Sequence, residues 1–291
     1  MTLAAIHVAG IDVGSTYTKA VVLDEANQIV GQGLVKTGFR LADAAERALG
    51  LACAPAGVEP AGLAYLATTG YGRFQVPFRN VNVTDLTANA RGARFLFPRT
   101  QTILDVGGQT MKASRLDERG KVHSFRLNDK CAAGTGAFLE KTARYMGFAT
   151  EEIGALAATS HSVVPISGVC AVFAESEVIN HLSQGSSPAD IMHGAIVSLV
   201  DRSLQLLRRV QMEPEFTLVG GILRFETMVR VIREKLGGSV NLPAGDLVQF
   251  TAALGAALLA RYRWNKLNVT PETETHTWTP SNTFSTNTAP S

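Results

Sequence analysis

The sequence has few cysteines, few aromatic residues and little net charge. Its 291 residues include three cysteines, 7% aromatic residues and 18% charged residues, and the formal net charge at pH 7 is +2. That net charge is too small to favour a nucleic-acid partner, and the chain has no run of basic residues that would bind one. Three cysteines also leave little room for structural disulfides, which an intracellular chain seldom uses.

Long apolar runs are also absent. No stretch reaches the roughly 18 uninterrupted apolar residues that a membrane-spanning helix needs. The N-terminal residues run straight into a predicted strand, without the pattern of a cleavable signal. We therefore expect a cytoplasmic protein that does not enter a membrane. At 46% hydrophobic residues, a chain of this length can bury a large core and is expected to form two domains.

The chain does contain two similar loops in which an Asp and a Gly follow a short apolar run. Their sequences are IDVGSTYTK, from Ile11 to Lys19, and LDVGGQTMK, from Leu104 to Lys112. Glycine N–H groups can approach phosphate oxygens closely, and an aspartate can hold a hydrated Mg²⁺ beside them. One such loop is also typical of an ordinary β-turn. Two of them, in separate halves of the chain, predict a site that holds the phosphates of a nucleotide.

The roles within these loops follow from the chemistry of phosphoryl transfer, which depends mostly on positioning and on neutralising charge. We expect Asp12 and Asp105 to hold the Mg²⁺, and one of them or Gln109 to orient the attacking water. Gln109 is alternatively a turn residue that is hydrogen-bonded to its own backbone. The residues expected to contact the phosphates are Gly14, Ser15, Thr16, Lys19, Gly107 and Gly108.

A third segment, TLVGGILRF, brings an apolar strand to Gly220 and Gly221. Without side chains, these two residues let the backbone pass close under a flat adenine and ribose. Together the three segments resemble the actin, sugar kinase and Hsp70 superfamily of ATPases. This resemblance implies an α/β, actin-like fold with two similar subdomains around a nucleotide cleft.

Hydrophobic periodicity predicts the same order of elements in both halves, a meander of three strands followed by helices. Strands are predicted over residues 7–12, 18–24, 29–36, 62–68, 102–105, 111–116 and 122–127, and helices over 41–51, 83–97, 136–146, 151–158, 175–182, 188–210, 225–236 and 249–263. The last helix has small residues on one face, which suits close packing where the halves meet.

This pattern predicts two subdomains, residues 1–98 and 99–264, with the last helix able to pack back on the first half. Residues 265–291 are rich in Thr, Asn, Ser and Pro and are expected to form a disordered tail. A peptide that docks on a partner is the alternative for that tail.

Two cysteines lie among glycines and other small residues, Cys131 in NDKCAAGTGAFLE and Cys170 in PISGVCAVFAESEV. Two thiolates cannot complete a four-thiolate site. Two chains related by a twofold axis could do so, and a single 4Fe-4S cluster would then lie between them. Spacing alone does not establish such a cluster, because cysteine is often just a small buried hydrophobe, and the sequence offers Cys53 no partner.

Four segments, NDKCAAGTG, CAVFAESEVI, VGGILR and TTGYGR, resemble motifs of the BadF/BadG/BcrA/BcrD-type ATPase family, over about residues 6–262. That family includes the activators of 2-hydroxyacyl-CoA dehydratases and the ATP-hydrolysing subunits of benzoyl-CoA reductase. The resemblance implies that Cys131 and Cys170 ligate a 4Fe-4S cluster shared with a partner subunit. It also places the backbone of Gly134, Thr135 and Gly136 in the cleft.

Glu175 and Glu177 follow Cys170 at the start of a predicted helix. They are either caps favoured by the helix dipole or contacts for the ribose or Mg²⁺.

The segment TDLTANARGA departs from the family pattern, because Ala88 and Asn89 stand where many activators carry Cys and His. We interpret this departure, together with QTMK after Gly108 and the polar tail, as a change in partner contacts. It favours the ATPase subunit of a benzoyl-CoA reductase, paired with a similar subunit. The homodimeric activator (component A) of a 2-hydroxyacyl-CoA dehydratase is the alternative.

Either role implies ATP or ADP, Mg²⁺, the bridging cluster, a low-potential ferredoxin-type donor, and catalytic reductase or dehydratase subunits with further iron–sulfur centres. A sugar or small-acid kinase of the same fold and an ATP-binding sensor also remain open. A kinase requires a substrate base near the cleft, for which the sequence offers no obvious residue, and it gives no role to the paired cysteine contexts. Iron content would distinguish the electron-delivering ATPase from the kinase and the sensor. ATP turnover would distinguish the kinase from the sensor.

Overall fold

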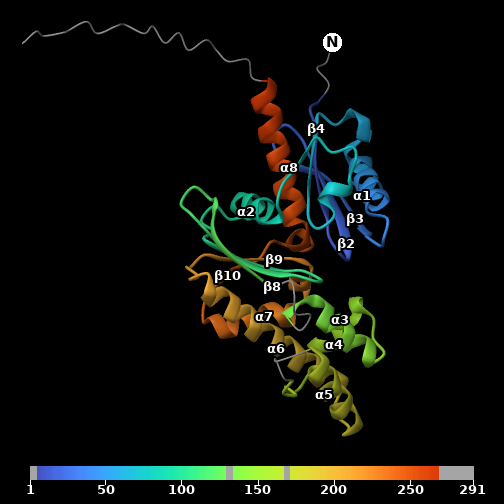
Figure 1. The fold of residues 1–291 in the computed structure, drawn as a ribbon, viewed down its shortest axis with the longest axis vertical. Coiled ribbons are helices and arrows are strands. Elements are labelled where there is room, and N and C mark those ends of the chain that lie inside the picture. The colour runs from blue at the N-terminus through green and yellow to red at the C-terminus, as the bar shows by residue number, and fades with distance from the viewer. Residues whose placement is uncertain (1–4, 129–133, 167–170, 269–291) are drawn as a thin grey trace, which may run out of the picture.

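Two five-stranded sheets, one in each of two lobes, organise the computed structural model, which describes residues 5–128, 134–166 and 171–268 (Figure 1). The first sheet has the strand order β3-β2-β1-β4-β5. Its strands are β1 (Val8–Val13), β2 (Tyr17–Leu23), β3 (Ile29–Lys36), β4 (Tyr65–Thr69) and β5 (Val81–Asn82). β1, β2 and β3 form an antiparallel meander, and β4 and β5 continue the sheet in parallel with β1.

The second sheet repeats this arrangement in the order β8-β7-β6-β9-β10. Its strands are β6 (Thr102–Val106), β7 (Met111–Leu116), β8 (Val122–Asn128), β9 (Phe216–Val219) and β10 (Val240–Asn241). β6 pairs antiparallel with β7 and parallel with β9, as β1 does with β2 and β4. The predicted duplication of the meander is therefore confirmed.

Local signals mark some of the helix ends. The helices are α1 (Leu41–Ala56), α2 (Asp85–Leu96), α3 (Gly136–Tyr145), α4 (Ile153–Ala158), α5 (Ala171–Ser183), α6 (Pro188–Arg209), α7 (Glu226–Leu236) and α8 (Leu247–Asn268). The hydroxyl of Ser187 accepts a hydrogen bond from the backbone of Asp190 at the start of α6. α7 ends at Gly237 in the left-handed conformation, which glycine adopts without strain. α8 continues past residue 265, where we expected the tail to begin, and the remainder of that segment lies outside the described residues.

The first sheet is covered by a helix on each face. α1 packs on one face through a core that includes Ile11, Val22 and Leu49. α8 packs on the other face against Val21 and Leu23 (Figure 1). The second lobe has its own larger core, between its sheet and the helices from α3 to α7. The two hairpins that connect β1 to β2 and β6 to β7 lie outside these cores and face each other between the lobes.

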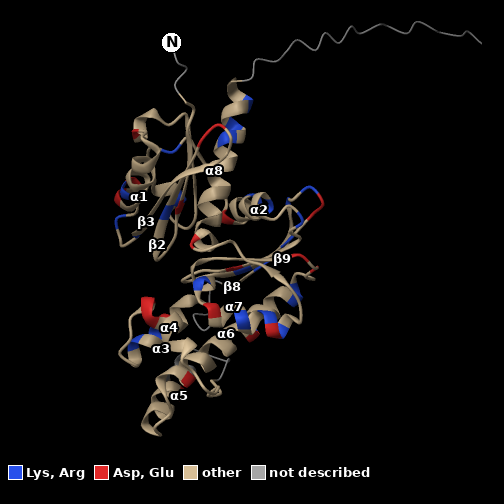
Figure 2. Ribbon diagram, turned by 180° about the vertical axis from the view of Figure 1, so that it is seen from behind, with Lys and Arg blue, Asp and Glu red and all other residues tan. Residues whose placement is uncertain are grey.

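Basic and acidic residues are interspersed over both lobes (Figure 2). Within the described ranges, no helix is both long enough and apolar enough to cross a membrane.

The backbone of α8 packs directly against the backbone of its neighbours. A Cβ atom at Gly255 of α8 would overlap the carbonyl oxygen of Ala88 in α2. A Cβ atom at Gly10 of β1 would overlap the carbonyl oxygen of Ala253. The predicted close packing of the small-residue face is thus confirmed. It is made mainly against the first sheet and α2, with further contacts to β9 in the second lobe.

Gly255→Ala is expected to lower the free energy of unfolding by about 2–3 kcal/mol, because the added methyl group must push α2 away from α8. Gly50→Ala in α1 is the matched control, since a Cβ atom at Gly50 meets nothing within 4 Å. The control should gain about 0.5–1 kcal/mol from its higher helix propensity. Urea unfolding followed by circular dichroism measures both changes. Equal midpoints for the two variants would show that α2 and α8 are not closely packed.

Candidate functional site

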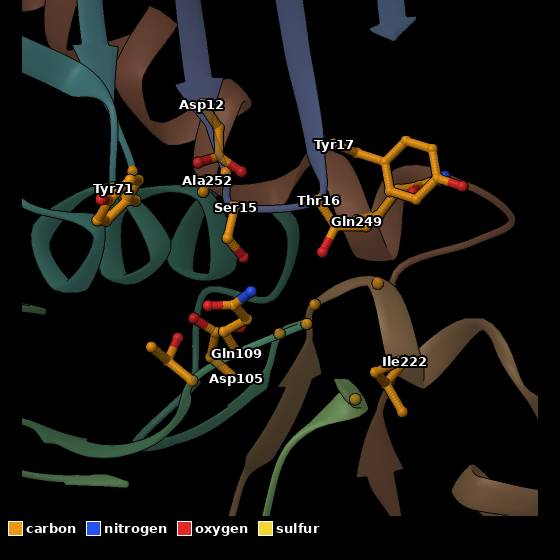
Figure 3. Close-up of a pocket in the computed structure, with 18 of the residues that line it drawn as sticks. Asp12, Ser15, Thr16, Tyr17, Tyr71, Asp105, Gln109, Ile222, Gln249 and Ala252 are labelled. Atoms are coloured by element: carbon orange, nitrogen blue, oxygen red, sulfur yellow. The ribbon is translucent and has the colours of Figure 1, made fainter. Parts of the chain in front are cut away.

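A cavity of about 790 Å³ lies between the lobes, and both Asp-Gly hairpins line it. Asp12 and Ser15 point into it from the first lobe and face Asp105 and Gln109 of the second lobe (Figure 3). The predicted site residues in its wall are Asp12, Gly14, Ser15, Thr16, Lys19, Asp105, Gly107, Gly108, Gln109, Gly136, Gly220 and Gly221. Three segments that are far apart in the sequence therefore meet at one cavity.

Each aspartate has a lysine opposite it on the neighbouring strand. Asp12 pairs in register with Lys19, and Asp105 pairs with Lys112. Directly opposed residues of an antiparallel pair point to the same face of the sheet. The Nζ atom of Lys19 lies 3.1 Å from Oδ2 of Asp12, and Nζ of Lys112 lies 3.6 Å from Oδ2 of Asp105. The two hairpins thus present equivalent Asp–Lys pairs to the cavity.

Each aspartate also rests against a glycine at the end of the adjacent parallel strand. Gly70 follows β4 with a φ of 86°, and Gly220 follows β9 with a φ of 107°. A Cβ atom at Gly70 would overlap Oδ1 of Asp12, and one at Gly220 would lie 2.8 Å from Oδ1 of Asp105. Both positions therefore require glycine for its conformation and for the space that the carboxylate occupies.

The pKa of Asp105 is raised to about 6, chiefly by burial and also by the nearby carboxylates of Asp85 and Asp12, while Lys112 acts to lower it. Nδ2 of Asn89 donates a hydrogen bond to Oδ2 of Asp105, over 3.1 Å. A buried carboxylate whose charge is only partly balanced gains from a nearby cation. Asp12 and Asp105 could therefore hold a hydrated Mg²⁺ between them, with its waters as the remaining ligands.

Gly136 is in the cavity wall, whereas Gly134 and Thr135 are not among the residues that line it. α3 begins at Gly136, and Thr135 is buried at 1% exposure. A Cβ atom at Gly134 would overlap the side-chain amide of Asn128. The expectation that this segment lines the cleft therefore stays a prediction for Gly134 and Thr135.

The helix that carries Glu175 begins earlier than expected. α5 starts at Ala171, so Glu175 is beyond the first turn and the interpretation of Glu175 as a helix cap was wrong. Its side chain lies outside the described part of the chain. Cys131 and Cys170 also lie outside the described residues. Cys53 is on the buried face of α1, where burial raises the pKa of its thiol to about 11.

Several further residues of the cavity wall were not predicted from the sequence. They are Tyr17, Tyr71, Arg73, Asp85, Asn89, Lys112, Glu140, Thr150, Ile222, Arg224, Phe225 and Gln249. Lys112 had a signal, because it follows Asp105 at the same spacing as Lys19 follows Asp12. Ala88 is fully buried and Asn89 is 6% exposed, so neither can contact a partner directly. Our interpretation of these two positions as partner contacts is corrected accordingly, since Asn89 instead orients Asp105.

Side-chain contacts beside the cavity also join the two lobes. The hydroxyl of Tyr17 donates to Oε1 of Glu151 over 2.9 Å, and Nζ of Lys36 lies 3.5 Å from the same oxygen. Glu151 belongs to a short 3₁₀ turn, Thr150–Glu152, in the second lobe. The loop that follows Asp12 is therefore tied directly to the opposite lobe.

Comparison with known proteins adds family-level information. The profile of the BadF/BadG/BcrA/BcrD ATPase family matches residues 9–260. The activator of lactoyl-CoA dehydratase from Anaerotignum propionicum is 38% identical over 255 residues, which are 88% of this chain and 97% of the relative. One of the subunits of benzoyl-CoA reductase from Thauera aromatica is 33% identical over 276 residues, which are 89% of this chain and 94% of the relative.

A solved structure resembles the whole two-lobed arrangement. The activator of the 2-hydroxyisocaproyl-CoA dehydratase from Clostridium difficile, solved with bound ADPNP, matches with a TM-score of 0.84 at 34% identity. The match covers 90% of this chain and 97% of that one. With the duplicated sheets around one cavity, it confirms the predicted actin-like ATPase fold. The chain belongs to the BadF/BadG/BcrA/BcrD ATPase family.

Proposed function

We propose that this protein is an ATP-hydrolysing activator that delivers low-potential electrons to a 2-hydroxyacyl-CoA dehydratase. Three relatives at 36–38% identity are named as activators of such dehydratases, whereas the benzoyl-CoA reductase subunit is 33% identical. These identities favour the activator over the reductase subunit that we expected from the sequence. Two identical chains would then share the cluster.

The proposal rests chiefly on a hydrogen-bonded link between the second phosphate loop and the start of α3. The backbone N–H groups of Gly136 and Ala137 donate to the carbonyl oxygens of Gly107 and Gly108, over 3.0 and 2.6 Å. Gly136 follows Cys131 by only five positions in the sequence. A nucleotide that moves the loop would therefore also move the beginning of the helix that follows Cys131.

The cysteine inventory fits a cluster shared by two chains. Cys131 and Cys170 from each chain would supply the four thiolates that a 4Fe-4S cluster needs. Cys53 is not available as a ligand, because it is buried in an apolar core with a raised thiol pKa. When bound, the cluster supplies a one-electron carrier.

The cavity residues fit the handling of Mg·ATP. Asp12 and Asp105 would hold the hydrated metal. Lys19 would neutralise phosphate charge, and the backbone amides of the loops would donate hydrogen bonds to phosphate oxygens. Gln109 would orient the attacking water, and Gly220 and Gly221 would pass beneath the adenosine. For hydrolysis to drive a change of state, ATP must bind one arrangement of the lobes more tightly. A differential affinity of about 5.5 kcal/mol would make that shift almost complete.

The proposal is tested by assaying iron, acid-labile sulfide and native mass of anaerobically purified protein, followed by ATP-dependent electron delivery to dehydratase components. We expect about four irons per pair of identical chains and delivery to a dehydratase. Iron only in a mixed pair with a second ATPase subunit, and delivery to a benzoyl-CoA reductase, would establish the reductase role instead. Iron-free protein that turns over ATP under every condition would contradict both and point to a kinase or sensor.

A further inference from the structure

The cavity contains a second lysine with the same relation to its hairpin as Lys19. Lys112 and Lys19 are each seven positions after an aspartate, and each is paired in register with that aspartate. Both side chains are 13% exposed and both line the cavity. The two lobes therefore each present one nearly buried ammonium group to the same space, from opposite sides.

Lys112 is held by three acceptors of the second hairpin and α2. Its Nζ atom forms an ion pair with Asp85, donates to Oγ1 of Thr110 over 3.1 Å, and lies 3.6 Å from Asp105. Asp85 lies in the first turn of α2, one helical turn before Asn89, which bonds to Asp105. The same face of α2 thus positions both members of the Asp105–Lys112 pair.

The charges around the cavity indicate that Lys112 does more than neutralise one carboxylate. The ammonium group of Lys112 is paired with the carboxylates of Asp85 and Asp105 in the cavity wall. Without Lys112, an incoming terminal phosphate would meet the carboxylates of Asp105 and Asp85 on this side of the cavity, with Arg224 as the remaining cation of the second lobe in the wall. The negative charges of these carboxylates and of the phosphate would repel each other and oppose binding.

We propose that Lys112 is a second phosphate-binding lysine, which contacts the terminal phosphoryl group of ATP from the second lobe, and that Asp85 positions it. The inference rests on the proposed ATP hydrolysis and adds the contact by which ATP is distinguished from ADP. In hydrolysis, the water oxygen bonds to the terminal phosphorus while the bond from that phosphorus to the bridging oxygen breaks. ADP leaves with the electron pair, and the released phosphate takes the proton of the water. Lys112 transfers no proton and neutralises the phosphoryl oxygens.

The test is Lys112→Met, with calorimetric titration of a non-hydrolysable ATP analogue and of ADP, each with Mg²⁺. We expect affinity for the analogue to fall about tenfold or more, which corresponds to one charge-assisted hydrogen bond, and affinity for ADP to change less than about twofold. Lys112→Arg should recover part of the discrimination. Lys121→Met, an exposed lysine in the same lobe, is the matched control and should bind both nucleotides as the wild type does. Equal losses for the two nucleotides in Lys112→Met would overturn the proposal.

A charge-balanced double variant separates binding from folding. Lys112→Met alone leaves Asp85 and Asp105 without their shared cation, whereas Lys112→Met with Asp85→Asn removes one charge of each sign. We expect the double variant to regain stability and to keep the loss of ATP discrimination. If it instead regains the wild-type ratio of ATP to ADP affinity, Lys112 serves only to neutralise Asp85, and the proposal is wrong. If the wild-type protein binds neither nucleotide, the proposed function itself fails.

Discussion

Replacing Cys131 with Ser is expected to abolish iron binding and electron delivery, while nucleotide affinity stays within about twofold of the wild type. Each chain of the pair would lose one of its two thiolates, and a serine hydroxyl is a poor ligand for iron because it is not ionised at neutral pH. Iron and sulfide assays on anaerobically purified protein, together with calorimetric titration of ADP, measure the two properties separately. Cys170→Ser is expected to behave in the same way.

Cys53→Ala is the matched control for the two serine variants. Cys53 is 1% exposed on the buried face of α1, so its truncation removes packing from the first lobe and is expected to cost about 1 kcal/mol of stability. It should leave the iron content unchanged. Normal electron delivery by either serine variant would remove the corresponding cysteine from the cluster.

The parts of the site that could be predicted are those set by local sequence. Within each hairpin, the spacing from Asp12 to Lys19 and from Asp105 to Lys112 fixes which residues oppose each other across a short turn. Register in such a hairpin depends on the turn and on the alternation of buried residues, and both are visible in the sequence. Gly220 could likewise be assigned to the site, because an apolar strand leads straight into it.

The contribution of α2 could not be predicted in this way. Asp85 and Asn89 reach the second hairpin only because α2 packs against α8, whose sequence lies more than 150 positions later. Gly255 and Gly92 permit that packing, since a Cβ atom at either would overlap backbone of the other helix. The segment around Asn89 has the composition of an exposed helix, so tertiary packing alone makes it part of the cavity.

Asp105→Asn is expected to lower ATP turnover by about a hundredfold or more, because it removes a preorganised charge from the proposed metal site. The fold should tolerate the change. Asn is nearly isosteric with Asp, its carbonyl oxygen can still accept from Asn89, and burial already disfavours the ionised carboxylate. Steady-state phosphate release measures turnover. Glu118→Gln, an exposed carboxylate in the same lobe, is the matched control and should retain full turnover.

The pH dependence of stability provides a second measurement on the same variant. The native pKa of Asp105 is about 6, whereas an aspartate in an unfolded chain titrates near about 3.9. Between these values the native state binds more protons than the unfolded state, so this residue makes the free energy of unfolding fall as pH rises through that interval. In nucleotide-free protein, Asp105→Asn should remove this contribution, and its stability should therefore decline less than that of the wild type between about pH 4 and 6. Unchanged ATP turnover would exclude Asp105 from the site. A loss of turnover with an unchanged pH dependence of stability would show that Asp105 takes part in hydrolysis but that its pKa is not raised by burial.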